Sequence, residues 1–356
     1  MSNFINISIL GASGYVGSEM IHLCLKHPNI KIQSLSANET AGEHVSKAIP
    51  GLRDTLDLKF SKLDEMNFTN IDFIFSCLPH AELQASLHKI PETVKIIDLS
   101  ADFRLKKSDD YEKWYDFKHT HPDRLSEFVY GLTEFNRDKI RSAKYIANPG
   151  CYPTSILMPL IPLLKNKVIN NNNIIIDSKS GYSGAGKSKK TENIFAEVNE
   201  NIKSYGIGDH RHIAEINQEL SIASGHPINV FFSANLIPVN RGILSNIYLT
   251  IDANKQNEIY DCLEKSFVNE NFISLLPLNE VPATREVVGS NRVSIGVKRG
   301  YKDDLLCIVS VIDNLLKGAA GQAMQNFNLM NEFNETTALT NNANILSVSY
   351  THLTLP

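Results

Sequence analysis

A predicted strand near the N-terminus runs directly into three evenly spaced glycines, and this junction constrains the fold more than any other segment. Residues 4–10 read as a strand and residues 15–26 as a helix, with Gly11, Gly14 and Gly17 at their junction. A strand, a glycine turn and a helix in this order typically bind the pyrophosphate of a dinucleotide, although the spacing G-x-x-G-x-x-G is a variant of the commoner pattern. Gly11 would allow the tight turn, Gly14 the approach of a pyrophosphate, and Gly17 close packing of the helix. A glycine turn without a ligand is the alternative.

The second predicted strand ends where the adenosine ribose of a bound dinucleotide would lie. It covers residues 30–35 and is followed by the polar segment 36–40. Ser36 and Asn38 could hydrogen-bond a ribose 2′-phosphate, whereas Glu39 could bind a 2′-hydroxyl. Because the segment contains no arginine, these residues leave open whether the cofactor carries the phosphate, and a loop that only makes a turn is the alternative.

Strands and helices continue to alternate as far as the middle of the chain. Residues 71–79 and 94–99 read as buried strands, and residues 80–89 between them as a helix. This alternation predicts an α/β fold with a Rossmann-type, doubly wound parallel sheet. Past Cys151 the pattern changes to longer strands with few helices, which predicts an α+β catalytic domain with a mixed, largely antiparallel sheet. The strands expected there are at residues 173–179, 228–236, 244–251, 293–297 and 305–312, with a helix at 256–268.

The length of 356 residues exceeds what a single hydrophobic core usually supports, so we expect two domains. The dinucleotide-binding domain would cover residues 1–147 and be completed by a C-terminal helix at residues 314–332. The catalytic, substrate-binding and dimerisation domain would cover residues 148–313. Residues 333–356 are unlike the rest of the chain, so we expect a disordered or partly extraneous tail there.

Composition narrows the class of protein. A net charge of −4, spread without blocks, argues against a nucleic acid or a membrane as partner. Five widely spaced cysteines without a C-x-x-C pair indicate a reducing compartment. No segment approaches the length of a membrane-spanning helix, and we therefore expect a cytoplasmic protein.

The octapeptide NPGCYPTS, residues 148–155, places a single cysteine between turn-forming residues and a predicted helix start. Thr154 is expected to cap the apolar helix that follows, so that Cys151 would lie near free backbone N–H groups. Such a position favours the thiolate, which is the form that attacks a carbonyl carbon. The alternative is a buried structural cysteine, the commoner role of a free cysteine.

Further segments carry side chains suited to chemistry. His210 could shuttle protons with Glu215 orienting it; residues exposed at a helix start and a metal site are the alternatives, but no other cysteine or histidine completes a set of metal ligands. Arg104 could bind a phosphate or carboxylate, or form a surface ion pair with Asp102. Residues 180–186, SGYSGAG, could wrap a nicotinamide or form an ordinary loop.

Together these segments resemble the N-acetyl-gamma-glutamyl-phosphate reductase family, within the aspartate-semialdehyde-dehydrogenase-like group. The resemblance extends from about residue 3 to about residue 332 and keeps the order and spacing of the motifs. It rests on residues 11–17, 98–104, 148–154, 180–186, 210–215 and 314–322.

The resemblance implies an NADPH-dependent reduction of N-acetyl-glutamyl phosphate to its semialdehyde in arginine biosynthesis, without a metal. Cys151 would be the nucleophile that forms a thioester, His210 the acid/base, and Glu215 the support of His210. Arg104, Asn148 and His212 would lie at the acyl phosphate substrate, and the protein would be a dimer or tetramer. The residues implied for NADPH are Gly11, Ser13, Gly14, Tyr15, Val16, Ser36, Ser180, Gly181, Gly184 and Asn314.

Two positions depart from the family pattern. Ala37 and Asn38 stand where a Ser-Arg pair commonly reads the 2′-phosphate, which bears on the preference for NADPH, and Ala214 stands where proline is frequent. Three alternatives remain: the same chemistry on a related acyl phosphate such as a carrier-linked aminoadipyl phosphate, a cysteine hydrolase, and a dinucleotide-sensing binding protein. The last would not need both Cys151 and His210.

Overall fold

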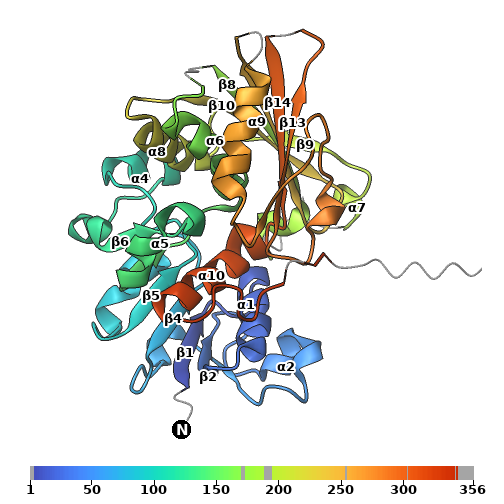
Figure 1. Cartoon of the computed structure of the whole chain (residues 1–356). Coiled ribbons are helices and arrows are strands. Elements are labelled where there is room, and N and C mark those ends of the chain that lie inside the picture. The colour runs from blue at the N-terminus through green and yellow to red at the C-terminus, as the bar shows by residue number, and fades with distance from the viewer. Residues whose placement is uncertain are drawn as a thin grey trace, which may run out of the picture.

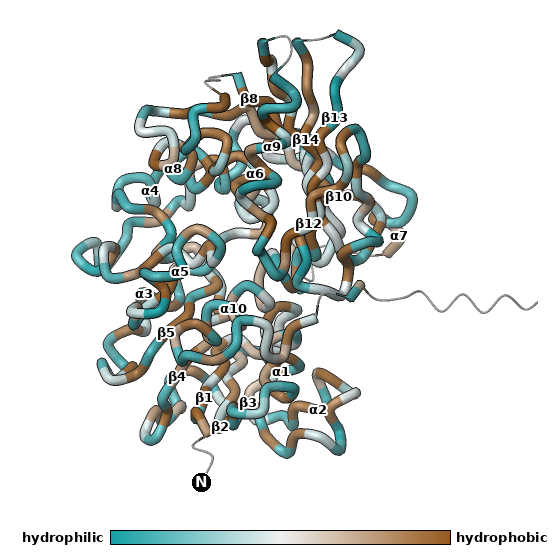
Figure 2. The backbone as a smooth tube through the Cα atoms, in the orientation of Figure 1, coloured by the Kyte–Doolittle hydropathy of each residue, from teal (hydrophilic) through white to brown (hydrophobic). Residues whose placement is uncertain are grey.

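The structure is a computed structural model that describes residues 4–169, 173–187, 195–252, 255–302, 304–340 and 342–343. It contains two seven-stranded sheets, which lie one above the other in Figure 1. The N-terminal half of the chain builds the lower sheet, and the segment after Cys151 builds most of the upper part. Apolar residues concentrate in the strands of both sheets, as Figure 2 shows.

The first sheet is entirely parallel and has the strand order β3-β2-β1-β4-β5-β7-β6. The chain leaves β1 toward β2 on one side and later returns to β4 on the other, so the turn after β1 lies at the point where ligands bind in such sheets. The expected doubly wound parallel sheet is therefore confirmed. Its strands are β1 (Ile5–Leu10), β2 (Ile30–Ser36), β3 (Phe60–Ser61), β4 (Phe73–Ser76), β5 (Lys95–Asp98), β6 (Phe128–Tyr130) and β7 (Tyr145–Ala147).

Helices cover this sheet, and one of them comes from the far end of the chain. The long helix α1 follows the glycine turn, with the bounds that the sequence predicts. By contrast, the helix expected at residues 80–89 begins only at Glu82, because Ala81 adopts a left-handed conformation with φ of 70°. The helices are α1 (Tyr15–Lys26), α2 (Val45–Ala48), α3 (Glu82–Ser86), α4 (Asp109–Tyr115), α5 (Thr133–Ser142) and α10 (Gly321–Met330).

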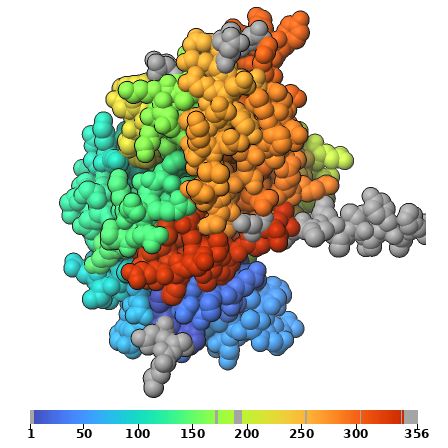
Figure 3. Space-filling model, in the orientation of Figure 1, coloured from blue at the N-terminus to red at the C-terminus, as the bar shows by residue number. Residues whose placement is uncertain are grey.

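Helix α10 packs on the first sheet although it follows the second sheet in the sequence. The ring of Phe327 lies 4.8 Å from that of Phe73 and 5.5 Å from that of Phe75, in the core of the parallel sheet. In Figure 3 this C-terminal segment forms a red band between the blue N-terminal elements and the orange strands of the second sheet. The first hydrophobic core is thus built from both ends of the chain.

The second sheet is mixed, with the strand order β12-β13-β14-β11-β8-β10-β9. Four of its neighbouring pairs are antiparallel, whereas β8 with β10 and β12 with β13 are parallel. The expected mixed, largely antiparallel sheet is therefore confirmed, with strand ends shifted from those expected. The strands are β8 (Ile174–Gly181), β9 (Lys203–Tyr205), β10 (Val230–Ile237), β11 (Ile243–Thr250), β12 (Ile273–Leu275), β13 (Val293–Arg299) and β14 (Leu305–Ile312).

One face of the second sheet carries the larger hydrophobic core of the molecule, and the opposite face has exposed apolar side chains. The buried face packs against α6 (Cys151–Lys165), α8 (His212–Ser224) and α9 (Gln256–Phe267). Successive residues of a strand point to opposite faces, so that Phe232 of β10 is fully buried while Phe231 remains 53% exposed. A short helix, α7 (Phe195–Val198), precedes β9.

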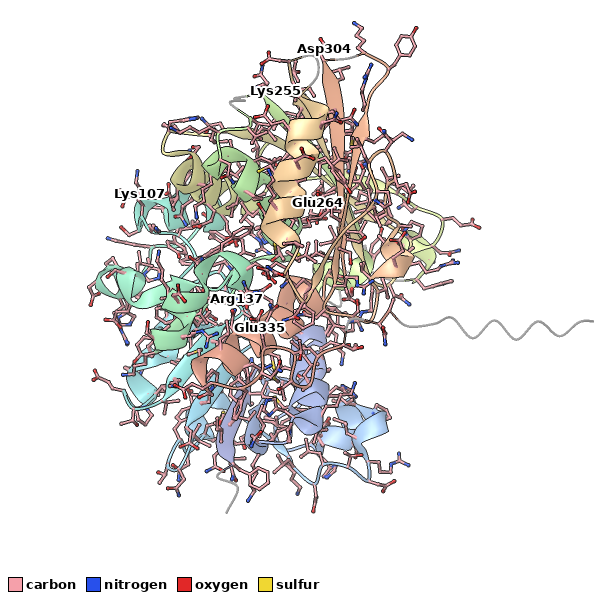
Figure 4. The ribbon with its side chains drawn as sticks, in the orientation of Figure 1. Lys107, Arg137, Lys255, Glu264, Asp304 and Glu335 are labelled. Atoms are coloured by element: carbon pink, nitrogen blue, oxygen red, sulfur yellow. The ribbon has the colours of Figure 1, made fainter. Side chains whose placement is uncertain are left out.

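The segment from residue 333 is packed where we expected a tail. The ring of Phe333 lies 5.1 Å from the ring of His27. The Glu335 carboxylate accepts a 2.9 Å hydrogen bond from the Arg137 guanidinium, and both of these side chains are labelled in Figure 4. The backbone oxygen of Thr340 accepts a bond from Asn291. The expectation of a disordered tail is wrong for residues 333–340, and its last part, residues 344–356, lies outside the described residues. No helix in the described segments is long and apolar enough to cross a membrane.

Candidate active site

The glycine turn after β1 is tightly packed at Gly11 and Gly17 and open at Gly14. Gly11 has φ of 70°, and a Cβ atom there would lie 2.4 Å from the backbone oxygen of Cys77. A Cβ on Gly17 would lie 2.6 Å from Cα of Ala12, whereas one on Gly14 would meet nothing closer than 3.6 Å. No side chain caps α1. The helix therefore presents free backbone N–H groups beside an open glycine, which is the arrangement that binds a pyrophosphate.

The other residues expected at this turn divide into two groups. Ser36 is buried and its Oγ accepts a 3.0 Å hydrogen bond from the Gly11 N–H, and Val16 packs against the core, so both hold the turn in shape. Tyr15 is 43% exposed on the rim. The backbone oxygen of Ser13 accepts a 3.5 Å hydrogen bond from Lys187, which belongs to the loop after β8. A loop of the second half of the chain thus reaches the glycine turn.

Asn314, at the end of β14, fixes the loop that was expected to wrap the nicotinamide. Its Nδ2 donates to Ser183 at 2.9 Å, and its Oδ1 accepts from the Gly242 N–H at 2.8 Å. Gly184 is needed for close packing, because a Cβ there would lie 2.8 Å from Oγ of Ser180. Gly181 similarly approaches the backbone of the β10–β11 loop. Small residues and one amide therefore hold this loop at the edge of the site.

Cys151 is the first residue of α6, with Gly150 as the N-cap. The expected cap, Thr154, instead lies in the first turn and its hydroxyl donates to the Gly150 carbonyl at 2.9 Å. From the other side comes the π-helical turn η8 (Leu316–Ala320), where a Cβ on Gly318 would lie 2.9 Å from Cβ of Cys151. The thiol is thus held between a helix start and a turn that only glycine can form so closely.

The thiol of Cys151 is not preset as a thiolate. Burial raises its pKa above the usual value, while the N–H of Tyr152 and the charge of Arg104 lower it and the Glu215 carboxylate raises it again. The helix start does lower the pKa of the thiol, as expected, but the loss of hydration on burial raises that pKa by more. At neutral pH the thiol is protonated and must lose its proton before it attacks.

Glu215 holds the backbone in front of Cys151. It is fully buried, and its Oε1 accepts hydrogen bonds from the Gly150 N–H at 2.8 Å and from the Tyr130 hydroxyl at 2.7 Å. Its Oε2 lies 3.4 Å from Nη1 of Arg104. None of its hydrogen bonds within the described segments reaches His210, the residue that we expected it to support.

Arg104 and Asn148 are bound within the protein. Arg104 donates from Nε to the Asn148 oxygen at 2.7 Å and from Nη2 to the Leu99 oxygen at 2.8 Å. Burial alone would lower its pKa, but the Glu215 carboxylate raises it above the usual range. The side chain of Asn148 bonds to the Ala319 oxygen and to Asn326. Both residues thus form the floor under Cys151, with their nitrogens already engaged.

His210 and His212 lie side by side beyond this floor, with ring centroids 4.8 Å apart. Nδ1 of His210 accepts the backbone N–H of His212 at 3.1 Å, so the neutral ring carries its proton on Nε2. Burial, together with the charge of Arg211, lowers the pKa of His210 to about 4. Burial also lowers the pKa of His212, whose Nδ1 has no hydrogen-bond partner among the described residues and whose Nε2 would lie 2.7 Å from a Cβ on Gly150. Both rings are neutral at neutral pH.

Comparison with known proteins gives a consistent picture. Family models described as the NAD-binding domain and the dimerisation domain of semialdehyde dehydrogenase match residues 6–143 and 151–314. The N-acetyl-gamma-glutamyl-phosphate reductase of Ehrlichia canis is 44% identical over 96% of this chain and 99% of its own, and that of Campylobacter jejuni subsp. jejuni is 43% identical with the same coverage. The chain belongs to the N-acetyl-gamma-glutamyl-phosphate reductase family. The resemblance seen in the sequence is confirmed, and the chain is an oxidoreductase with an NAD-binding domain.

Solved structures extend the likeness of this N-acetyl-gamma-glutamyl-phosphate reductase family member to a wider fold group. Aspartate semialdehyde dehydrogenase II from Vibrio cholerae superimposes with a TM-score of 0.69 at 20% identity, covering 92% of this chain and 99% of that one. The aspartate semialdehyde dehydrogenase from Candida albicans, solved with NADP, gives a TM-score of 0.63 at 18% identity, covering 92% and 98%. These structures share the fold.

Several groups that surround the cysteine are not predicted by the sequence. Tyr130 binds Glu215 but lies on β6, a strand of three residues without a recognisable pattern. Tyr205 and Tyr152 share a 3.0 Å hydrogen bond and flank the His210 ring. Arg211 stands inside the H-R-H motif but was given no role of its own. Its position between two histidines was the one available signal.

Proposed function

We propose that this member of the N-acetyl-gamma-glutamyl-phosphate reductase family reduces N-acetyl-L-glutamyl 5-phosphate to N-acetyl-L-glutamate 5-semialdehyde with NADPH, in arginine biosynthesis. One observation carries the proposal: Cys151 stands at the start of α6, with a floor built by Glu215 and Arg104 and two neutral histidines beside Gly150. Relatives of the chain at 42–44% identity over nearly its full length bear the name of this reductase.

The glycine turn supports NADPH as the cofactor. The free N–H groups of α1 and the open space at Gly14 suit a pyrophosphate, and Ser13 and Tyr15 lie on the rim of the same turn. The loop containing Ser180, Gly181 and Gly184, held by Asn314, would enclose the nicotinamide end. When bound, NADPH supplies the hydride for the reduction.

The thiol of Cys151 opens the reaction. Its sulfur forms a C–S bond with the acyl carbon while the C–O bond to phosphate breaks, so that inorganic phosphate leaves with the electron pair and a thioester remains. Reduction of the thioester gives a thiohemiacetal on Cys151. Breaking its C–S bond releases the aldehyde and returns the thiolate.

His210 holds and moves the protons of these steps. Because its Nδ1 accepts the His212 N–H, Nε2 is the nitrogen that exchanges a proton with the reacting groups. A ring with a pKa of about 4 is neutral in the resting enzyme and gives up an acquired proton readily. Because the pKa of the Cys151 thiol is raised, a base must take its proton as the sulfur attacks, and Nε2 of His210 is the group to which we assign this role.

The reaction is tested in reverse with N-acetyl-L-glutamate 5-semialdehyde, inorganic phosphate and NADP, following the absorbance of NADPH. We expect phosphate-dependent reduction of NADP by the wild type and by Cys307→Ser, which alters a cysteine on the outer face of the second sheet. Cys151→Ser should lose at least about a hundredfold in rate and keep its affinity for NADPH, because a hydroxyl is a far weaker nucleophile. Release of phosphate from the acyl phosphate without consumption of NADPH would contradict the reductase and favour a hydrolase.

The outer face of the second sheet supports a dimer. Its exposed apolar side chains line a groove of about 570 Å³ between β8, β10, β11 and β14 and include Ile175, Phe231, Tyr248 and Leu305. The segment carrying them matches a model described as a dimerisation domain. Phe231→Lys should yield a monomer in light scattering, whereas a dimer that persists would place the interface elsewhere. All five cysteines are unpaired, in keeping with the cytoplasmic location that we propose.

A further inference from the structure

Arg211 is a cation in the site without an anionic partner. Its guanidinium forms no ion pair and no hydrogen bond within the described segments, and it lies 5.9 Å from the centre of the Tyr115 ring. Two buried cations differ, because each has a carboxylate partner: Arg104 lies 3.4 Å from Glu215, and Lys317 lies 2.6 Å from Glu134. Arg211 is therefore the charge that remains available to an anion.

The position of Arg211 gains no stability from an ion pair or from a capping hydrogen bond within the described segments. It is the N-cap of α8, makes no capping hydrogen bond, and places a positive charge at the positive end of the helix dipole. A side chain exposed to solvent at such a place gains little from packing. The unfavourable position is explained if an anion binds there.

The guanidinium belongs to the side of the site that contains the histidines. The Tyr115 ring beneath it lies 5.4 Å from the ring of His80. Its charge contributes to the lowered pKa values of His80, His210 and His212. Arg104 is the cation that lowers the pKa of the Cys151 thiol. Because Arg211 stands between His210 and His212 in the chain, an anion on its guanidinium would lie beside the two histidine rings, which are 4.8 Å apart.

The substrate of the proposed function has two anionic groups. The acyl phosphate is bonded to the carbon that Cys151 attacks, so it lies at the start of α6, where free N–H groups favour an anion. The α-carboxylate lies at the other end of a short carbon chain. We propose that Arg211 binds the α-carboxylate and thereby restricts the enzyme to acyl groups that carry one. The inference rests on the proposed function.

The reverse reaction separates the two anions, because it uses the aldehyde and phosphate as distinct substrates. Arg211→Gln should raise the KM for N-acetyl-L-glutamate 5-semialdehyde about ten- to hundredfold, the value of a charge-assisted bond, and leave the KM for phosphate unchanged. Arg211→Lys should fall between wild type and Arg211→Gln. Arg141→Gln, which removes an exposed charge at the end of α5, should change neither constant.

A second aldehyde makes the test specific to the carboxylate. 4-Acetamidobutanal is the same molecule without the α-carboxylate, so wild type and Arg211→Gln should reduce NADP with it at equal efficiency. A rise in the KM for phosphate, an unchanged KM for the semialdehyde, or a loss with both aldehydes alike would overturn the assignment. A wild-type enzyme that produces no NADPH from the semialdehyde and phosphate would refute the proposed function itself, which distinguishes the two failures.

Discussion

The buried carboxylate of Glu215 has two effects, and substitutions at this position can separate them. It holds the backbone before Cys151, and it raises the pKa of the Cys151 thiol. Glu215→Ala removes the acceptor for the Gly150 N–H and the Tyr130 hydroxyl and leaves Arg104 without its counter-ion. Glu215→Gln keeps an acceptor oxygen of similar shape and removes only the charge. The two variants therefore divide geometry from electrostatics.

The stability changes follow from these contacts. Breaking a buried ion pair costs about 3–5 kcal/mol, and we expect Glu215→Ala to lose that much free energy of unfolding, since both partners are at most 5% exposed. Glu215→Gln breaks the same ion pair but preserves the bonds from Gly150 and Tyr130, so its loss should be smaller than that of Glu215→Ala by about 1–3 kcal/mol. Urea unfolding at one fixed protein concentration measures both, because association would make the midpoint depend on concentration.

The thiol should respond in the opposite direction. Because the negative charge of Glu215 raises the pKa of Cys151, its removal in Glu215→Gln should lower that pKa and move the inflection of the alkylation rate with iodoacetamide to lower pH. Glu219→Gln, which alters a buried carboxylate one turn further along α8, serves as the control. A Glu215→Ala loss below about 1 kcal/mol, or an alkylation profile that does not move in Glu215→Gln, would refute this account of the site.

Three further substitutions test other parts of the site. His210→Asn should lower kcat by about two to four orders of magnitude with NADPH affinity preserved, as measured by steady-state kinetics and fluorescence titration. Gly318→Ala would place a Cβ 2.9 Å from Cβ of Cys151, so we expect at least a tenfold loss of kcat and a loss of about 1–3 kcal/mol in the free energy of unfolding. Asn38→Arg adds a cation after β2 and should raise kcat/KM for NADPH by roughly ten- to hundredfold and leave that for NADH unchanged.

Specific results would contradict each of the three. If His212→Asn were damaging and His210→Asn harmless, the proton-transfer roles would be exchanged. Full activity in Gly318→Ala would show that the η8 turn can move away from the cysteine without consequence. A strong wild-type preference for NADPH that Asn38→Arg does not alter would show that residues elsewhere read the 2′-phosphate.

Local patterns predicted much of the fold. The turn from β1 into α1 depends on residues adjacent in sequence, and α1 begins and ends where the periodicity places it. The N-cap of α6 lies four residues before the expected one, at Gly150 instead of Thr154, because Thr154 binds the Gly150 carbonyl inside the helix. A threonine can cap a helix that begins after it, or it can bond to the carbonyl four residues earlier inside a helix. The sequence does not distinguish the two arrangements.

The electrostatics of the site depend on contacts between distant segments. From the sequence, Arg104 could bind an anion or pair with Asp102. In the structure its guanidinium donates to the carbonyls of Leu99 and Asn148, which follow the ends of β5 and β7. The raised pKa of Cys151 likewise requires burial by segments from elsewhere in the chain, including the turn at Gly318. Such partners become neighbours only through tertiary packing. The spacing of the motifs therefore predicts which residues belong to the site but not which groups they bind.

The return of α10 to the first sheet has a consequence for synthesis on the ribosome. Phe327 completes the apolar core around Phe73 and Phe75, yet it is translated after every strand of both sheets. While the second half is being synthesised, part of the apolar core of the N-terminal half stays exposed to solvent. In that state the nascent chain can aggregate or bind chaperones. Release of the finished chain is thus the event that allows the N-terminal half to close, and a message truncated before α10 would yield a protein with every strand and an unfinished nucleotide-binding domain.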